Sequence, residues 1–191
     1  MNRLLLLVLT LSCSSLAFAG PITTTINFAG QAGYTYLSNQ YASQGVTFSN
    51  SLVLAAGDYD PVDYPVPTAG GNVITNDPND PITLDFTNSI ASVSGWYSDP
   101  DGVTITAYDG LNVVGVFNGA ADYGSSLEFY ISTFSNSDPI TSITISDDSG
   151  SPDNEIVSDL AITQTPEPGS IVLLGTGLLG LAGAVRRKYA R

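Results

Sequence analysis

The sequence has almost no positive charge and very few reactive side chains. It contains no histidine, one cysteine (Cys13) and five basic residues in 191. The basic residues occur only near the two ends of the chain: Arg3, Arg186, Arg187, Lys188 and Arg191. Residues 20–165 contain 17 carboxylates and no Lys, Arg, His or Cys, which gives this stretch a formal charge of −17.

These absences exclude several classes of function for the stretch. Without cations it cannot neutralise phosphates, so it does not bind nucleic acid. Catalysis by Ser-His-Asp, Cys-His or Ser-Lys lacks its base or its thiol, and disulfides and Cys/His zinc sites lack their ligands. Two carboxylates are enough for a glycosidase, but only Glu128 and Glu155 accompany the aspartates, and no pattern pairs any two of them. We therefore predict a protein that is not an enzyme and has no catalytic residues.

The N-terminal residues 1–19 have the pattern of an export signal. Arg3 is followed by an apolar run, and small residues end at Ala19 in an A-x-A cleavage pattern. Two alternatives remain open, an N-terminal membrane anchor and lipidation at Cys13. Cleavage after Ala19 would remove Cys13 and leave a mature chain without cysteine.

The C-terminal residues combine a helix breaker, an apolar segment and a basic cluster. Pro166, Glu167 and Pro168 precede residues 169–185, which are 17 uncharged residues. A helix of that length is just long enough to cross a bilayer core of roughly 30 Å. Arg186, Arg187 and Lys188 follow it directly, and basic residues favour the cytoplasmic side. The pattern predicts a membrane-spanning helix that leaves the acidic stretch outside.

A G-x-G-x-x-G pattern at 175–180 lies inside this apolar segment. A dinucleotide site needs a βαβ unit and an acidic residue about 20 positions further on, and only 11 residues follow. We interpret these glycines as small residues that let helices approach closely in a membrane.

Residues 165–191 as a whole resemble the PEP-CTERM sorting signal of Gram-negative bacteria that make exopolysaccharide. The resemblance implies that Pro166, Glu167 and Pro168 form the recognition motif and that Arg186, Arg187 and Lys188 are the stop-transfer charges. It further implies transient anchoring in the inner membrane, processing by an exosortase, and release or attachment at the cell surface or extracellular matrix. A permanently tail-anchored periplasmic protein is the alternative.

Residues 20–164 show the alternation of half-buried β-strands. Apolar side chains recur at every second position in short runs separated by Asp-Pro and Asp-Gly turns. About eight to ten such strands predict one all-β domain, a β-sandwich of jelly-roll type. The inward positions are predicted to include Thr24, Ile26, Phe28, Val46, Phe48, Ile82, Leu84, Phe86, Val103, Ile105, Ala107, Leu127, Phe129, Ile131, Ile143, Ile145, Leu160 and Ile162.

This middle region also resembles domains that often precede the sorting signal. The resemblance rests on residues 41–48, 105–109 and 159–162, and it implies a sandwich similar to carbohydrate-binding modules without identifying a ligand. The expected partners are therefore polysaccharide, calcium or further copies of the chain.

Three aromatic residues are candidates for ligand contact. Tyr59 and Tyr64 lie in a long, acidic, Pro-rich segment, where they could stack on sugars, although we favour packing against the edge of the sandwich. Strict alternation places Trp96 outward, as a stacking platform for a pyranose ring. We favour instead a bulge at Gly95, which would reverse the alternation and bury Trp96.

Acidic turns suggest a structural Ca²⁺ ion as a further hypothesis. Asp147 and Asp153 lie in an acid-rich turn that does not complete an EF-hand loop. Asp159 joins them only by resemblance to the calcium site of jelly-roll modules. A divalent ion would relieve the like-charge repulsion, whereas the alternative is that each aspartate makes turn hydrogen bonds.

Overall fold

The computed structural model describes residues 21–60, 71–76, 80–133, 138–147, 156–164, 175–177, 179–180 and 187. The chain divides into two compact units, of which one is Ile22–Thr165 and the other combines Met1–Pro21 with Pro166–Arg191. Among the described residues no helix is both long enough and apolar enough to span a membrane. Most of the predicted membrane-spanning segment, and all of the predicted signal peptide, lie outside the described residues.

The unit Ile22–Thr165 is built from β-strands, as the alternating pattern predicts. One short 3₁₀ helix, Ala42–Gln44, interrupts them. The strands in chain order are β1 (Ile22–Ile26), β2 (Tyr36–Leu37), β3 (Val46–Ser49), β4 (Ser51–Leu54), β5 (Val73–Asn76), β6 (Ile82–Asp99), β7 (Val103–Asp109), β8 (Asn112–Gly119), β9 (Asp122–Ser132), β10 (Ile140–Asp147) and β11 (Ile156–Gln164).

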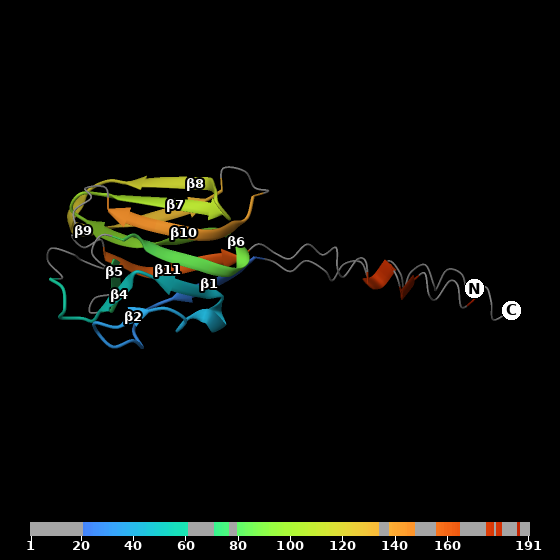
Figure 1. Cartoon of the computed structure of the whole chain (residues 1–191), viewed down its shortest axis with the longest axis horizontal. Helices are drawn as coiled ribbons and strands as arrows, with labels where there is room; N and C mark the ends of the chain where they lie inside the picture. Colours follow the sequence, from blue (N-terminus) through green and yellow to red (C-terminus); the bar gives the residue numbers. More distant parts are fainter. Residues whose placement is uncertain are drawn as a thin grey trace, which may run out of the picture. The chain divides into compact units, whose positions relative to one another are not determined.

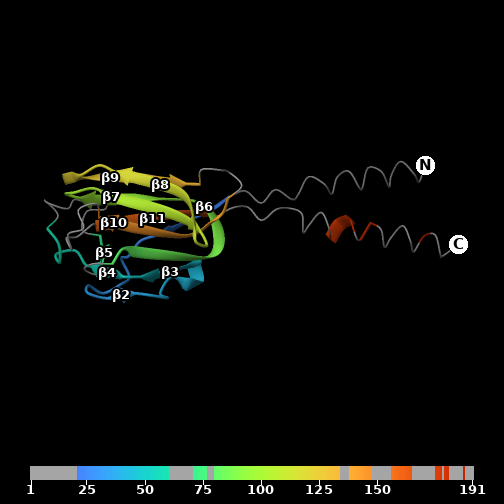
Figure 2. The ribbon, with the colours of Figure 1, turned by 45° about the horizontal axis from the view of Figure 1, so that its top comes forward.

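The long strand β6 belongs to both layers of the sandwich. Its first half pairs with β3 along one edge and with β10 along the other. Its second half pairs with β9 and β11 in the same way. Figure 1 shows β6 between β10, β7 and β8 on one side and β11 and β1 on the other, and Figure 2 shows its bend. The predicted β-sandwich is confirmed, with one strand of 18 residues where the sequence pattern suggested separate runs.

Each half of β6 organises one layer. The first layer runs β3–β6–β10–β7–β8, and all of its pairs are antiparallel. The second runs β9–β6–β11 and continues through β5 and β4 to β2. Strand β1 also pairs with β11, along residues 160–164, whereas β5 pairs with it only at Val157. Two short strands thus follow one another along β11.

The core lies between the layers and includes most of the predicted inward positions. All of the predicted positions are buried except Thr24, which is half-buried, and Leu127, which is partly buried against the core. Three rings, those of Phe28, Tyr41 and Phe48, meet edge to face with centroids 5.7–6.0 Å apart. Such aromatic pairs stabilise a core beyond the area that they bury.

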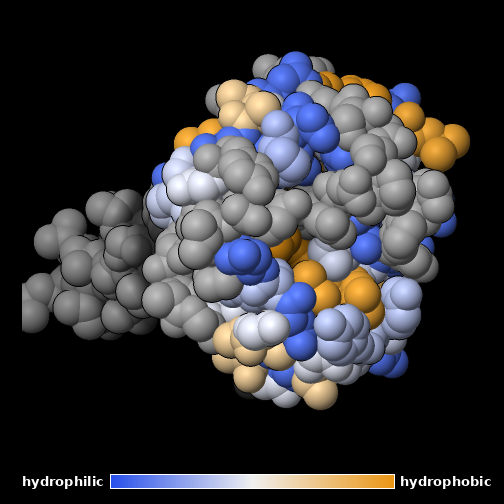
Figure 3. All heavy atoms as spheres, turned by 90° about the vertical axis from the view of Figure 1, so that its left-hand side faces the viewer, coloured by the Kyte–Doolittle hydropathy of each residue, from blue (hydrophilic) through white to orange (hydrophobic). Residues whose placement is uncertain are grey.

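The outer surface mixes polar and apolar side chains. The exposed large apolar residues of the described unit come from several strands and loops: Ile22, Tyr34, Tyr36, Leu111, Val113, Val116 and Tyr130. On the face shown in Figure 3, the hydrophobic residues that are coloured lie in separate patches between hydrophilic ones.

The bulge that we expected at Gly95 lies instead on the neighbouring strand. Strand β6 keeps its register with β9 from Ser92 to Tyr97, so alternation continues through Gly95. Against β11 the register shifts between Ser158 and Ala161, so that two β11 residues face Gly95. Gly95 and Tyr97 are buried and Trp96 is half-buried on the opposite face, so the expected reversal of phase is wrong.

Gly95 has a packing role that a larger residue does not fulfil. A Cβ atom on Gly95 would lie 2.8 Å from Cε1 of Phe129 and 2.9 Å from Cδ2 of Leu160. Both side chains are fully buried in the core. The absence of a side chain at Gly95 therefore lets these two core residues pack directly over β6.

We predict that Gly95→Ala lowers the free energy of unfolding by about 1–3 kcal/mol, because it overpacks a filled core. Denaturation of the full chain followed by tryptophan fluorescence measures this change. The matched control is Gly30→Ala, since a Cβ atom at Gly30 meets nothing within 4 Å. Equal stability of the two variants would contradict the proposed role of Gly95.

Candidate functional site

A pocket opens where the partner of β11 changes from β1 to β5. Strand β1 pairs with β11 from Leu160 onward and β5 pairs with it at Val157, so neither strand pairs with Ser158 and Asp159. The cavity in this gap has a volume of about 180 Å³. It is lined by Asn27, Phe28, Ala29, Gly71, Asn72, Ser158 and Asp159.

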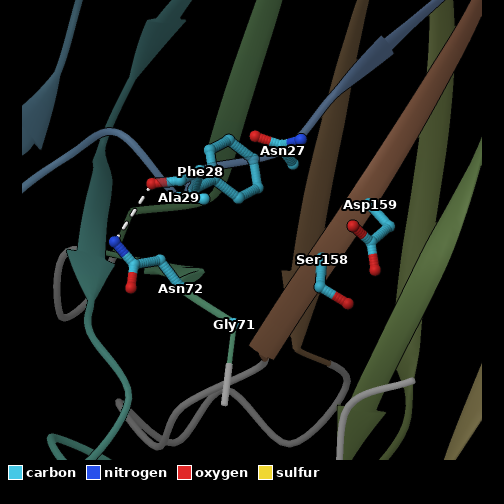
Figure 4. Close-up of a pocket in the computed structure, with 7 residues that line it drawn as sticks. All are labelled: Asn27, Phe28, Ala29, Gly71, Asn72, Ser158 and Asp159. Atoms are coloured by element: carbon cyan, nitrogen blue, oxygen red, sulfur yellow. Dashed lines mark hydrogen bonds between the residues drawn. The ribbon is translucent and has the colours of Figure 1, made fainter. Parts of the chain in front are cut away.

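The side chain of Asn72 holds one wall of the pocket in place. Its Nδ2 donates to the carbonyl oxygens of Phe28, at 3.0 Å, and Gln31, at 2.7 Å. Figure 4 shows the bond to Phe28 joining the segment after β1 to the start of β5. The carbonyl of Asn27 is also fixed, because it accepts a hydrogen bond of 2.9 Å from the hydroxyl of Tyr41. Tertiary hydrogen bonds therefore position this wall.

The opposite wall is polar and belongs to the bulge of β11. Asp159 has a φ of +49°, a left-handed conformation that aspartate tolerates better than most residues. Figure 4 shows the Ser158 and Asp159 side chains next to each other on β11. The Ser158 hydroxyl is buried and has no hydrogen-bond partner among the described residues. A buried hydroxyl without a partner costs about 1–3 kcal/mol, so this atom needs a water or a ligand.

Two of the predicted aromatic candidates do not line this pocket, but each interacts with a residue that does. Trp96 is the cross-strand partner of Ser158, so the two side chains share one face of the sheet. The Tyr59 hydroxyl donates to the carbonyl of Gly71 at 2.9 Å, and burial raises the pKa of Tyr59 above its usual value. Tyr59 is thus folded against the start of β5, as we favoured, and Tyr64 lies outside the described residues.

The predicted calcium ligands do not form one cluster in the described part of the chain. Asp147 ends β10, Asp159 lines the pocket, and Asp153 lies outside the described residues. No three His, Cys, Asp or Glu side chains of the described ranges are arranged to hold a metal ion. Calcium binding by these three aspartates stays a prediction.

A second unusual carboxylate, Asp99, lies at the end of β6. It is fully buried, and its Oδ1 accepts hydrogen bonds from the backbone N–H groups of Asp101, at 2.7 Å, and Gly102, at 2.8 Å. Its Oδ2 has no hydrogen-bond partner among the described residues. Burial, together with the negative charges of Asp147 and Asp101, raises the pKa of Asp99 to about 6, against the lowering effect of the two N–H donors.

The Asp-Pro and Asp-Gly turn patterns of the sequence include residues 99–102, but they do not predict the burial of Asp99. Asp-Pro-Asp-Gly is a common turn pattern, in which the first aspartate accepts backbone hydrogen bonds. The orphan oxygen is a tertiary feature, because the cross-strand partner of Asp99 is Asp122, 23 positions away. Asn27, Asn72 and Ser158 were also missed, since they follow no motif in the sequence.

Comparison with known proteins identifies the C-terminal signal. Residues 164–188 match the PEP-CTERM protein-sorting motif. The predicted sorting signal is therefore confirmed, and the motif indicates an exported protein that is sorted to the cell envelope or surface. A search of curated proteins found no match to this chain.

Solved structures give a weak similarity for the β-domain. A mutant of a family 29 carbohydrate-binding module is 12% identical, with a TM-score of 0.46 over 75% of this chain and 93% of that one. Another mutant of that module, complexed with cellulohexaose, is 12% identical, with a TM-score of 0.47 over 76% and 93%. A cleaved adhesin domain of Lys-gingipain is also 12% identical, with a TM-score of 0.46 over 75% and 100%.

We predict that Asp99→Asn changes how stability depends on pH. The pKa of Asp99 is higher in the folded protein, about 6, than its ordinary value of 3.8, so the folded state binds the proton more tightly. Wild-type stability then falls as the pH rises through this window, by on the order of 2–3 kcal/mol. The amide side chain of the variant does not titrate in this pH range, so the stability of the variant should lack the part of the decrease that Asp99 causes.

Urea denaturation at pH 4.5 and pH 7.5 measures the difference. Asp85→Asn, at an exposed position of β6, is the control for removing one of many negative charges. If Asp99→Asn keeps the wild-type loss between the two pH values, the raised pKa of Asp99 is wrong.

Proposed function

We propose that the protein is a non-catalytic component of the cell surface or extracellular matrix, delivered there by an exosortase. The observation that carries this proposal is the PEP-CTERM protein-sorting motif at residues 164–188. The motif accounts for the basic residues near the C-terminus of a chain whose middle region has none. The cargo is the β-sandwich, and the sorting signal determines its destination.

The order of the segments suggests a sequence of events in a Gram-negative cell. The signal peptide 1–19 directs export, and residues 169–185 then hold the chain in the inner membrane. Arg186, Arg187 and Lys188 stay on the cytoplasmic side because of their charge. The exosortase recognises Pro166, Glu167 and Pro168 and cleaves the C-terminal region, after which the domain reaches the surface.

Association with exopolysaccharide is the role that we propose for the domain itself. Its polar surface and its small pocket suit hydroxyl-bearing ligands better than apolar ones, and its charge disfavours nucleic acid and anionic membranes. A carbohydrate-binding module with a structural Ca²⁺ ion is the second candidate. The arrangement that favours sugar binding is the pocket lined by Ser158 and Asp159, with Trp96 as the cross-strand partner of Ser158.

We expect mass spectrometry of the mature protein from its native host to show a C-terminus that lacks residues 186–191. Replacing Pro166, Glu167 and Pro168 together with alanine removes the recognition motif, so the intact chain should stay in the membrane fraction. The mature form should also co-purify with the exopolysaccharide fraction.

Replacing Arg191 with alanine is the control, because it leaves the motif and the basic cluster in place and should leave processing unchanged. A wild-type protein that retains Arg191 after export would contradict processing and support a permanent tail anchor. Unchanged processing of the triple variant would contradict the role of the Pro-Glu-Pro motif.

A further inference from the structure

The lining of the pocket beside the β11 bulge offers both apolar and polar groups. Exposed Ala29 lies on one side, together with Asn72 and with Phe28, whose side chain is buried in the core. Ser158 and Asp159 lie on the other side, with the side chain of Asn27 nearby (Figure 4). A sugar ring has the same mixed character, because its C–H groups are apolar and its hydroxyls lie around the rim. The pocket therefore offers a contact for each part of a sugar unit.

The polar groups of the pocket match hydroxyls in their hydrogen-bonding capacity. The residue Ser158 is 3% exposed, and its hydroxyl, which is unpartnered within the described residues, can both donate and accept. The Asp159 carboxylate accepts only, so its ligand must donate hydrogen bonds, as hydroxyls do. The Asn27 side chain supplies a donor and an acceptor in addition.

The size of the cavity limits the ligand to one unit. Pockets for drug-sized molecules span about 300–1,000 Å³, whereas this cavity measures about 180 Å³. It admits a single monosaccharide, either free or at the end of a chain. Further units of a longer chain would extend over the surface toward Trp96, which is half-buried next to Ser158.

The charge of the domain selects among sugars. Residues 20–165 contain 17 carboxylates and no cation, and one of these carboxylates, that of Asp159, lines the pocket. A uronate or a phosphorylated sugar would bring a further negative charge close to Asp159 without any compensating cation. Like charges at such short distances repel strongly where solvent is partly excluded.

We propose that this pocket binds a neutral monosaccharide unit of the exopolysaccharide, with sugar hydroxyls donating to Asp159 and exchanging a hydrogen bond with Ser158. The inference rests on the proposed association with polysaccharide, and it adds the site and the chemical class of the sugar.

The test is titration of the full chain, kept in a zwitterionic detergent, with neutral gluco-, manno- and galacto-oligosaccharides and with acidic oligogalacturonate. We expect a neutral oligosaccharide to bind in calorimetry and to shift the amide NMR signals of Asn27, Ser158 and Asp159. Asp159→Asn keeps a residue that tolerates the left-handed backbone and removes only the charge. It should weaken binding at least tenfold, as expected for losing a hydrogen bond to a charged group.

Ser158→Ala separates a ligand contact from a structural role. If Ser158 serves the ligand, the variant binds the sugar at least fivefold more weakly while its melting temperature stays the same or rises. If the hydroxyl is satisfied only by an internal water, the melting temperature falls and binding is unchanged, which would overturn the proposal. Asp85→Asn is the control variant, and it should bind like wild type.

Binding of oligogalacturonate as tight as that of every neutral sugar would also overturn the proposal, as would the absence of binding by all the probes. Neither result would contradict the proposed sorting by an exosortase, because mass spectrometry measures C-terminal processing independently of sugar binding. A chain that is processed but binds no sugar would refute the pocket assignment alone.

Discussion

The sharing of β6 between the two layers is the constraint on which the rest of the domain depends. Its first half pairs with β3 and β10 and its second half pairs with β9 and β11, so both edges of the strand are hydrogen-bonded along most of its length. A one-residue slip of β6 would turn its buried side chains outward in both layers at once. Its register therefore positions the partners of both sheets.

The pocket follows from the way in which β11 adapts to β6. Opposite Gly95, β11 contains one residue more than β6, and that extra residue interrupts the edge to which β1 and β5 pair. Gly95 lets Phe129 and Leu160 close the core beneath the bulge. Neither β1 nor β5 pairs with Ser158 and Asp159, so these two polar residues can line a cavity. The core is not disturbed, because Phe129 and Leu160 fill it at Gly95.

Local sequence patterns predicted the strands and the core but not the relationships between distant segments. Alternation identified Ile82, Leu84 and Phe86 as inward-facing residues, and they are buried because period two is a property of each strand alone. The alternation at residues 82–86 indicates only a short run, whereas pairing partners on both edges continue the strand to Asp99. A bulge is expected at Gly95 because a glycine inside a strand often marks a bulge. The bulge lies instead on β11, where Asp159 has a left-handed backbone conformation. The preference of aspartate for that conformation is too weak to predict a bulge from the sequence.

The distribution of charge connects the domain to its sorting signal. The brief anchoring in a membrane that we propose needs cations on the cytoplasmic side, and the chain places four of its five basic residues after residue 185. The exported domain has none, so its carboxylates cannot form ion pairs with Lys, Arg or His within the domain. Asp99 is buried without a cationic partner: two backbone N–H groups donate to its carboxylate, and its pKa is raised. Asp159 lies instead in a solvent-accessible pocket where hydroxyl donors can reach it. A domain of this charge would be repelled by an anionic matrix, so the contacts with polysaccharide that we propose for it are hydrogen bonds to neutral units.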